Sequence, residues 1–515
     1  MEKIKQESIG DVFFKKEIDN KQQLSIEQCH IDLNIALKVP ENIARRYTLV
    51  AIGLENHQLK VAMKEPFNMY ALDDLRLITK LSIKPVLASK EEIEHLIQQV
   101  YTPAHMQTIV SKVDMQCADE KVHQPIVEND SDAPTIALLD NLLEICTLKG
   151  ATDMHIEPFK SDVCIRYRID GQLYILTKLN KSTLSAITTC IKVLAGLDIA
   201  ERRMPQDGRI SRIVNGQQVD LRISILPTIY GEKTVIRLFY AGGKNLLLTD
   251  MGFHPQDYEK LQTLLRNPHG IILVTGPTGS GKSTTLTAML KTFNSVENNI
   301  ITVEDPVENI TEGINQVAVN NKIGLTFASV LKAILRQDPD IIMIGEMRDA
   351  QTSSIALRSA ITGHLVLSTL HTNDAASAIV RLIDMGMEAY MVGAAVKGVV
   401  AQRLVRRLCE KCRKPHVVTK SEALLYKVPE GIQVYNPRGC QACHETGYKG
   451  RIAIHEVMMI DHELEDMIST ARVKAEAIRE KAIQSGMRTL WDNAYLNVLK
   501  GNTSLEEMLK VAYTP

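Results

Sequence analysis

The chain has 515 residues, of which 45% are hydrophobic and 23% are charged, and its formal net charge at pH 7 is −1. This length favours three or four domains, and the near-neutral charge gives no global electrostatic reason to expect nucleic-acid binding. No apolar run reaches the roughly 18 residues of a membrane span, and the start, MEKIKQESIGDVFFKK, lacks a signal-peptide core, so we expect a soluble, cytosolic protein.

The N-terminal region, residues 1–102, has the composition of a small globular domain. SIEQCHIDLNIALKVPENIARRY and KEEIEHLIQQVY indicate short helices around a strand, QLKVAM. Between 103 and 133 the apolar periodicity fades and an acidic segment, VENDSDAP, follows. We therefore expect a linker over 103–133.

Residues 134–245 predict a small α+β domain. APTIALLDNLLEICTLKG is typical of a helix that ends at Gly150. Alternating apolar residues flank turns at Asp170-Gly171 and Asn215-Gly216, which indicates two hairpins. GEKTVIRLF adds a further strand.

Residues 250–404 change to an α/β pattern. Short apolar strands, IILVTG, NIITVED, DIIMIGE and HLVLSTLH, each end in polar residues. Open α/β sheets bind their ligands at the carboxyl ends of the strands. We therefore expect the functional site at that edge, and a helical region at 453–515.

The segment GPTGSGKS matches the phosphate-binding loop G-x-x-x-x-G-K-[ST] in full. The glycines let backbone N–H groups surround phosphate oxygens, Lys282 reaches the β- and γ-phosphates, and the Ser283 hydroxyl is placed to ligate Mg²⁺. A chance match in a glycine-rich turn is the alternative, and the strand before and helix after disfavour it. The predicted ATP-binding residues are Gly276, Pro277, Thr278, Gly279, Ser280, Gly281, Lys282, Ser283 and Thr284.

Carboxylates follow two of the predicted strands. In DIIMIGE a glycine, Gly345, fills the position where an aspartate usually stands, and Glu346 is the candidate that polarises the attacking water. We expect Glu304 and Asp305 of VEDPVE to take part of the contact with Mg²⁺ and its water. The alternative is that Asp305 and Glu308 are solvated loop residues.

Two histidines flank the strand in TGHLVLSTLHTNDA. We expect His364 and His371 to sense the γ-phosphate, although a lone histidine at such a position is usually structural. In the middle domain the segments RRMPQDGRI, VDLRIS and TVIRL place five arginines within 36 residues. We expect Arg209, Arg222 and Arg237 to act as fingers toward a nucleotide on a neighbouring domain or subunit, with a solvated charged face as the alternative. The other two are Arg202 and Arg203.

Four of the nine cysteines form two C-x-x-C pairs, Cys409/Cys412 and Cys440/Cys443. In a reduced compartment two such knuckles point to a structural, tetrahedral zinc site with no open position. A redox dithiol pair and unliganded thiols are the alternatives. We expect a zinc subdomain at 405–452.

GPTGSGKS, ITVEDPVE, IIMIGEMRDAQT and TGHLVLSTLHTNDA, in this order, resemble the bacterial secretion ATPase superfamily. Upstream, ATDMHIEPF and RRMPQDGRIS resemble the domain before the ATPase core in its type II secretion and type IV pilus assembly members. The cysteine pairs and the ending GNTSLEEMLKV are similar to the secretion and pilus-extension members rather than to pilus-retraction ATPases. The resemblance covers residues 134–515.

The resemblance implies an α/β fold with a RecA-like P-loop ATPase core. A small α+β (PAS-like) domain and an N-terminal α+β domain would precede this core, and a zinc-binding insert would follow it. It also implies a homohexamer that uses ATP, Mg²⁺ and Zn²⁺ to drive pilus or pseudopilus assembly. Its partners would be an inner-membrane platform protein and a cytoplasmic adaptor, which recruit it to the inner face of the cell membrane.

Two questions stay open at the sequence level. Many relatives carry an N-terminal Arg-Leu-Gly-type motif that binds cyclic di-GMP, and QESIGDVFFKKEIDNKQQLSIEQCH has none, so we expect partner docking there instead. The alternative function is a nucleic-acid translocase or DNA-uptake motor on the same core. With aromatic residues at 4%, a base-stacking groove is disfavoured, and we expect no nucleic-acid partner.

Overall fold

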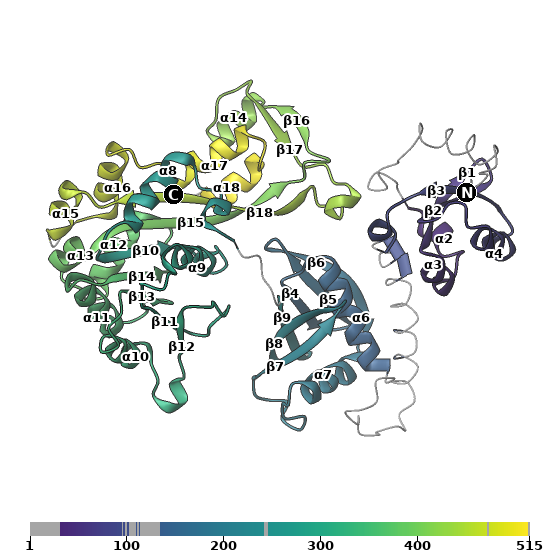
Figure 1. The fold of residues 1–515 in the computed structure, drawn as a ribbon, viewed down its shortest axis with the longest axis horizontal. Coiled ribbons are helices and arrows are strands. Elements are labelled where there is room, and N and C mark those ends of the chain that lie inside the picture. Colours follow the sequence, from purple (N-terminus) through teal and green to yellow (C-terminus); the bar gives the residue numbers. More distant parts are fainter. Residues whose placement is uncertain are drawn as a thin grey trace, which may run out of the picture. The chain divides into compact units, whose positions relative to one another are not determined.

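The computed structural model of the chain describes residues 31–94, 96–97, 100–101, 110, 113, 134–240, 246–470 and 473–512. The expected linker at 103–133 therefore lies outside the described residues except for 110 and 113, and so does the segment 1–30. The chain divides into two compact units, residues 1–241 and 242–515. Each unit is described by itself (Figure 1).

The N-terminal part of the first unit contains a three-stranded sheet in the order β1-β2-β3. β1 and β2 are antiparallel, whereas β2 and β3 are parallel. The predicted strand QLKVAM is confirmed as β2, whose inner face is buried with the helices in one apolar core. The elements are α2 (Leu33–Ala36), α3 (Glu41–Tyr47), β1 (Leu49–Glu55), β2 (Gln58–Met63), α4 (Met69–Thr79) and β3 (Ser82–Leu87).

The middle domain is a six-stranded antiparallel sheet in the order β6-β5-β4-β9-β8-β7, packed against two helices. Both predicted hairpin turns are confirmed: Asp170, Gly171, Asn215 and Gly216 all have positive φ, as a two-residue turn between twisted strands requires. Its elements are α6 (Pro134–Leu148), β4 (Asp153–Pro158), β5 (Asp162–Ile169), β6 (Gln172–Asn180), α7 (Thr183–Leu194), β7 (Gln206–Val214), β8 (Gln217–Thr228) and β9 (Gly231–Tyr240).

The second unit is built on a seven-stranded sheet in the order β12-β11-β13-β14-β10-β15-β18. Its central strands are parallel and buried on both faces, which explains their continuous apolar runs. Ile271 and Leu273 of β10 face the core formed with α10–α13, while Ile272 and Val274 face the core formed with α8 and α9. The sheet is thus covered by helices on both sides (Figure 1).

The elements of this unit before β15 include the parallel strands whose carboxyl ends form the candidate site. They are η2 (Leu248–Met251), α8 (Pro255–Leu265), β10 (Gly270–Thr275), α9 (Lys282–Phe293), β11 (Ile300–Glu304), β12 (Asn315–Ala318), η3 (Asn321–Ile323), α10 (Phe327–Ile334), β13 (Ile341–Ile344), α11 (Ala350–Ile361), β14 (Leu365–Leu370), α12 (Ala375–Asp384) and α13 (Ala389–Ala395).

Two long antiparallel strands, β15 (Val396–Leu408) and β18 (Tyr448–Met459), extend past the rest of the sheet and carry the cysteine-rich insert. They run without a break through positions 404 and 452, so the insert is an extension of the core sheet (Figure 1). The insert contains β16 (Lys414–Val417), α14 (Lys420–Tyr426), β17 (Gln433–Asn436) and η4 (Gln441–Cys443).

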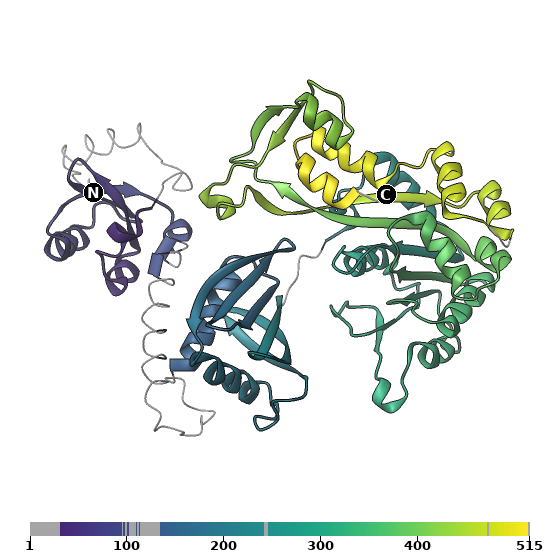
Figure 2. The ribbon, with the colours of Figure 1, turned by 180° about the vertical axis from the view of Figure 1, so that it is seen from behind.

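The expected helical region at 453–515 is wrong for 453–459, which belong to β18, whereas helices follow from His462 onward. The last two helices lie along the β15/β18 extension (Figure 2). Arg406 of β15 donates to Glu507 of α18 at 2.7 Å, and the Leu408 amide donates to the Asn502 carbonyl at 2.8 Å. The ending GNTSLEEMLKV therefore braces this extension. The helices are α15 (His462–Ser469), α16 (Ala475–Gln484), α17 (Leu490–Leu499) and α18 (Leu505–Ala512).

Among the residues described, no helix is long and apolar enough to cross a membrane.

Candidate active site and tetracysteine cluster

The phosphate-binding loop connects β10 to α9, as the sequence predicts. Gly276, Gly279 and Gly281 have positive φ, which lets the loop turn tightly before the helix begins at Lys282. The side chain of Lys282 folds back onto the loop and donates to the carbonyls of Gly276 (2.8 Å) and Pro277 (3.1 Å). Burial lowers the pKa of Lys282, and the nearby Glu346 carboxylate opposes that shift.

Glu346 lies at the exit of β13 on the same edge of the sheet. Its carboxylate accepts from Arg348 at 2.5 Å and interacts with Nε2 of His371 at 3.2 Å. The preceding loop is fixed to β14, because the Thr369 hydroxyl donates to the Gly345 carbonyl at 2.7 Å. Glu346 is thus a mostly buried carboxylate, 13% exposed, held by two groups beside the lysine of the loop.

Gly345 occupies a position with little room for a side chain. A Cβ atom there would lie 3.3 Å from the Val303 carbonyl oxygen and 3.4 Å from Cα of Glu304, both on β11. A larger side chain at this position would therefore need a small shift of β11.

The structure separates the two predicted histidines. His371 follows β14 at the carboxyl edge, where it contacts Glu346. His364 precedes β14, and its carbonyl accepts from Gly270, at the start of β10. One strand of six residues, about 16–20 Å, therefore lies between His364 and the loop edge, and Nδ1 of His364 pairs locally with the Ser359 carbonyl.

The Glu304 carboxylate lies at the end of β11, two strands beyond β14. Its Oε1 accepts from Thr302 (2.6 Å) and from Gln316 of β12 (3.0 Å). Asp305 follows it and interacts electrostatically with Arg348. These residues offer the oxygen ligands that Mg²⁺ prefers. Ser283 is exposed on the first turn of α9, and the carboxylates of Glu304 and Asp305 follow β11 at the same edge of the sheet.

Several residues at this edge were not expected from the sequence. The hydroxyls of Thr275 and Thr372 lie 2.7 Å apart and join the end of β10 to the segment after His371. Gln402 of β15 contacts the phosphate-binding loop directly. Thr372 lies in the quoted segment TGHLVLSTLHTNDA, but its contact with Thr275 depends on the pairing of β10 with β14. Gln402 belongs to none of the quoted motifs, and only the pairing of β10 with β15 reveals its contact with the loop.

The three predicted arginines of the middle domain form one row across its sheet. Arg209 on β7 pairs with Arg222 on β8, which pairs with Arg237 on β9. The row continues to Asp153 on β4, whose carboxylate accepts from Arg237 at 2.9 Å. Arg222 stacks on the Phe239 ring at 4.0 Å. Asp153 therefore partly neutralises the charge of Arg237.

The four paired cysteines gather at the tip of the insert, with all Sγ atoms within 4.8 Å of one another. Three of the distances are 3.8 Å (Cys409–Cys440), 3.8 Å (Cys412–Cys443) and 3.7 Å (Cys440–Cys443). A tetrahedron with the Zn–S length of about 2.3 Å has edges of about 3.8 Å, whereas a disulfide needs about 2.05 Å. The geometry fits one tetrahedral metal ion and disfavours a redox pair.

Backbone donors complete this cluster. The amides of Cys440 and Gly447 each donate to Sγ of Cys443 at 3.2 Å. Burial opposes ionisation of the Cys443 thiol, but these donors outweigh it and lower the pKa of Cys443. Two nearby arginines do not serve the cluster, because Arg406 and Arg413 bind the C-terminal segment instead.

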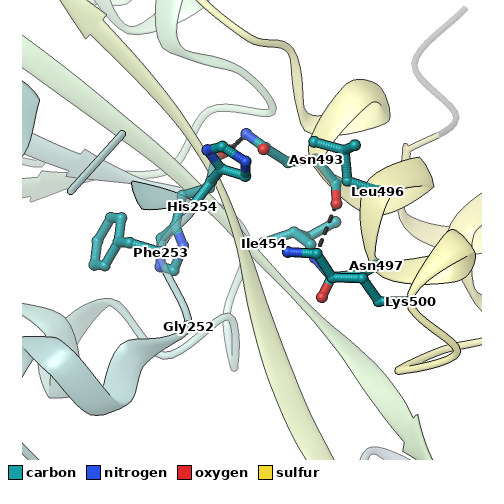
Figure 3. Close-up of a pocket in the computed structure, with 9 residues that line it drawn as sticks. Gly252, Phe253, His254, Ile454, Asn493, Leu496, Asn497 and Lys500 are labelled. Atoms are coloured by element: carbon teal, nitrogen blue, oxygen red, sulfur yellow. Dashed lines mark hydrogen bonds between the residues drawn. The ribbon is translucent and has the colours of Figure 1, made fainter. Parts of the chain in front are cut away.

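A small, partly open cavity of about 50 Å³ lies elsewhere in this unit, between the start of α8, β18 and α17 (Figure 3). The His455 ring is buried there and stacks on Phe253 with centroids 3.6 Å apart. Neither ring nitrogen has a partner among the residues described, and burial lowers the pKa of His455 to about 3. Asn493 donates to Asp257 (3.0 Å) and to the His455 carbonyl (2.6 Å). The cavity is lined by Gly252, Phe253, His254, Ile454, His455, Asn493, Leu496, Asn497 and Lys500.

Comparison with models of known protein families shows the family of this chain. The family model described as type II/IV secretion system protein matches residues 128–510, which include every element of the site above. The chain belongs to this family. A second model, the MshEN domain, matches residues 20–107.

Named members of the secretion family are similar over most of the chain. The type II secretion system ATPase E of Vibrio cholerae is 40% identical over 92% of this chain and 96% of its own length. The type IV pilus assembly ATPase PilB of Myxococcus xanthus is 39% identical over 94% of this chain and 88% of its own length. PilB of Thermus thermophilus is 43% identical over 93% of this chain, which spans 54% of that relative.

Solved structures share the fold of the secretion family. The Legionella pneumophila ATPase DotB has a TM-score of 0.54 at 20% identity and covers 73% of this chain and 95% of its own. The pilus retraction motor PilT, solved with ADP, has a TM-score of 0.50 at 24% identity and covers 73% of this chain and 97% of its own. The predicted RecA-like ATPase fold is thereby confirmed.

Proposed function

We propose that this secretion-family ATPase hydrolyses ATP at residues 276–284 to drive assembly of pilus or pseudopilus subunits. The observation that carries the catalytic part is the placement of Glu346 beside the loop, with His371 and Arg348 holding its carboxylate. A carboxylate fixed in this way accepts the proton of a water aligned for in-line attack.

The residues of the loop have distinct roles in this proposal. Lys282 exchanges its two loop carbonyls for phosphate oxygens when ATP binds, which needs only a rotation of its side chain. Ser283, with Glu304 and Asp305, would hold Mg²⁺ directly or through water. When bound, Mg²⁺ neutralises charge on the β- and γ-phosphates. His371, which contacts Glu346, would then bind the γ-phosphate and couple its presence to the position of the Glu346 carboxylate.

The arginine row is proposed to act on the nucleotide of a neighbouring subunit. Arg209 and Arg222 lie side by side in register, so the sheet presents two guanidinium groups together to a phosphate. Arg237 contributes less, because Asp153 already neutralises it. An arginine finger of this kind raises turnover by about 10³-fold or more.

Trans action requires a ring, and we propose a homohexamer. Head-to-tail interfaces that close on themselves give such rings. We further propose that the N-terminal domain docks on a cytoplasmic adaptor, that the ring works on a platform protein at the inner face of the membrane, and that the tetracysteine cluster binds zinc. The names of the relatives support a role in pilus assembly or type II secretion, and the cysteine geometry supports the zinc site.

Mixing variant chains tests the trans arrangement. Arg209→Ala and Glu346→Gln proteins are each expected to turn over ATP slowly, while mixed rings contain interfaces in which both residues are intact. Recovery of activity on mixing supports the proposal. Mixed rings that form, as judged by mass, and yet stay inactive contradict it.

Stimulation of turnover tests the motor assignment. A platform-protein fragment with anionic lipid should raise the ATPase rate, and single-stranded DNA should leave it unchanged. Stimulation by DNA alone would favour the translocase instead.

A further inference from the structure

The phosphate-binding loop rests on the neighbouring strand β15. Ala401 of β15 pairs with Thr275, the last residue of β10, and Gln402 comes next. Its side chain lies beneath the loop with the residue only 2% exposed. A glutamine is rarely buried this deeply unless its amide is bonded at both ends.

Both ends of the Gln402 amide are bonded to the loop and its helix. Nε2 donates to the Ser280 carbonyl at 2.8 Å, and Oε1 accepts from the Thr285 hydroxyl at 2.6 Å. The orientation of the amide follows from chemistry, because the Ser280 carbonyl only accepts. Gln402 thus joins Ser280, two residues before Lys282, to the first turn of α9.

The shape of the loop is also matched to Gln402. A methyl group at Gly276 would overlap the backbone carbonyl oxygen of Gln402, and one at Gly281 would lie 2.9 Å from the side-chain Nε2 of Gln402. These two glycines therefore let the loop approach β15 closely, in addition to permitting its positive φ angles.

From these contacts we infer that Gln402 is a positioning residue that holds the phosphate-binding loop in its nucleotide-binding shape. The inference deepens the proposed function and rests on it. Backbone N–H groups bind phosphate well when their orientation is fixed before the ligand arrives. Gln402 contacts neither Glu346 nor His371, so it acts on nucleotide affinity and leaves the chemical step unchanged.

The test uses the full-length protein and two variants. Gln402→Met keeps the length of the side chain and removes both hydrogen bonds, while Thr285→Val removes one. The dissociation constant of a fluorescent ATP analogue with Mg²⁺ and the turnover rate at saturating ATP are measured for each. Gln402→Met should weaken binding about tenfold, equivalent to about 1.4 kcal/mol, with turnover within about twofold of the parent.

Thr285→Val should weaken binding by a smaller factor, and the double variant should bind no more weakly than Gln402→Met, since both changes remove the same bond. If Gln402→Met does not fold, Thr285→Val with parental affinity overturns the inference. Folded Gln402→Met with parental affinity does the same, and so does a turnover loss that exceeds the binding loss.

Asn493→Leu is the matched control, because it removes two buried amide bonds of the same kind away from the loop. It should lower the melting temperature and leave nucleotide affinity unchanged. Equal weakening in this control would mean that Gln402 acts only through stability, and the inference would fail. A parent protein that binds no nucleotide would refute the proposed function instead.

Discussion

Replacement of Cys412 by serine should empty the tetracysteine cluster and unfold the insert. The Sγ–Sγ distances of 3.7–3.8 Å match a tetrahedral zinc site, so the parent should carry one zinc ion per chain. Between Cys409 and Gly447 the buried apolar residues other than cysteine are three valines, Val418, Val428 and Val434. Their burial contributes about 5 kcal/mol, whereas a structural zinc ion contributes on the order of 10 kcal/mol.

The metal is therefore the larger contribution, and the assay is metal analysis with amide hydrogen exchange. Cys412→Ser should contain little zinc, and amides between Cys409 and Gly447 should exchange faster, while those of α9 stay protected. Cys164→Ser, a buried cysteine of the middle domain, is the control and should keep its zinc. A zinc-free parent, or an insert equally protected after metal removal, would refute this reasoning.

Two further predictions concern buried charges. As the pH is lowered from 6.5 to about 4, His455 should reduce the free energy of unfolding by about 1.4 kcal/mol for each pH unit, because unfolded His455 takes up a proton that the folded ring, with its pKa lowered to about 3, does not. His455→Phe should flatten this part of a urea-unfolding series, and an unchanged slope would count against the prediction. Glu507→Gln should cost about 3 kcal/mol in the same assay, because it removes the carboxylate charge that pairs with the mostly buried Arg406 guanidinium. A loss below about 0.5 kcal/mol would show that the pair is effectively solvated.

Features encoded by neighbouring residues could be predicted from the sequence. The turn at Asp170-Gly171 combines a small polar residue with glycine, both tolerant of positive φ, so its hairpin is set locally. The phosphate-binding loop is likewise one continuous motif, and its strand and helix end where the pattern indicates. The cysteine pairs also meet as expected, since the C-x-x-C spacing brings the two thiols of each pair close enough to bind one metal ion.

Features that depend on distant pairing could not be predicted. Arg237 meets Asp153 only because β4 and β9 are neighbours, 84 positions apart in sequence at that contact. Gln402 reaches the loop because β15 pairs with β10, although 122 positions separate it from Ser280. His364 and His371 look equivalent around one strand, yet the strand itself separates them across the sheet. Strand order in the two sheets decides the first two cases, and the six-residue strand β14 decides the third.

The most direct test of the central claim compares Glu346→Gln with Lys282→Ala in ATP binding and single-turnover hydrolysis. Glu346→Gln should bind ATP with near-parental affinity, because the carboxylate acts on water, and hydrolyse it about 10²–10⁴-fold more slowly. Lys282→Ala should lose binding itself. A Glu346→Gln protein that hydrolyses ATP at the parental rate would contradict the account.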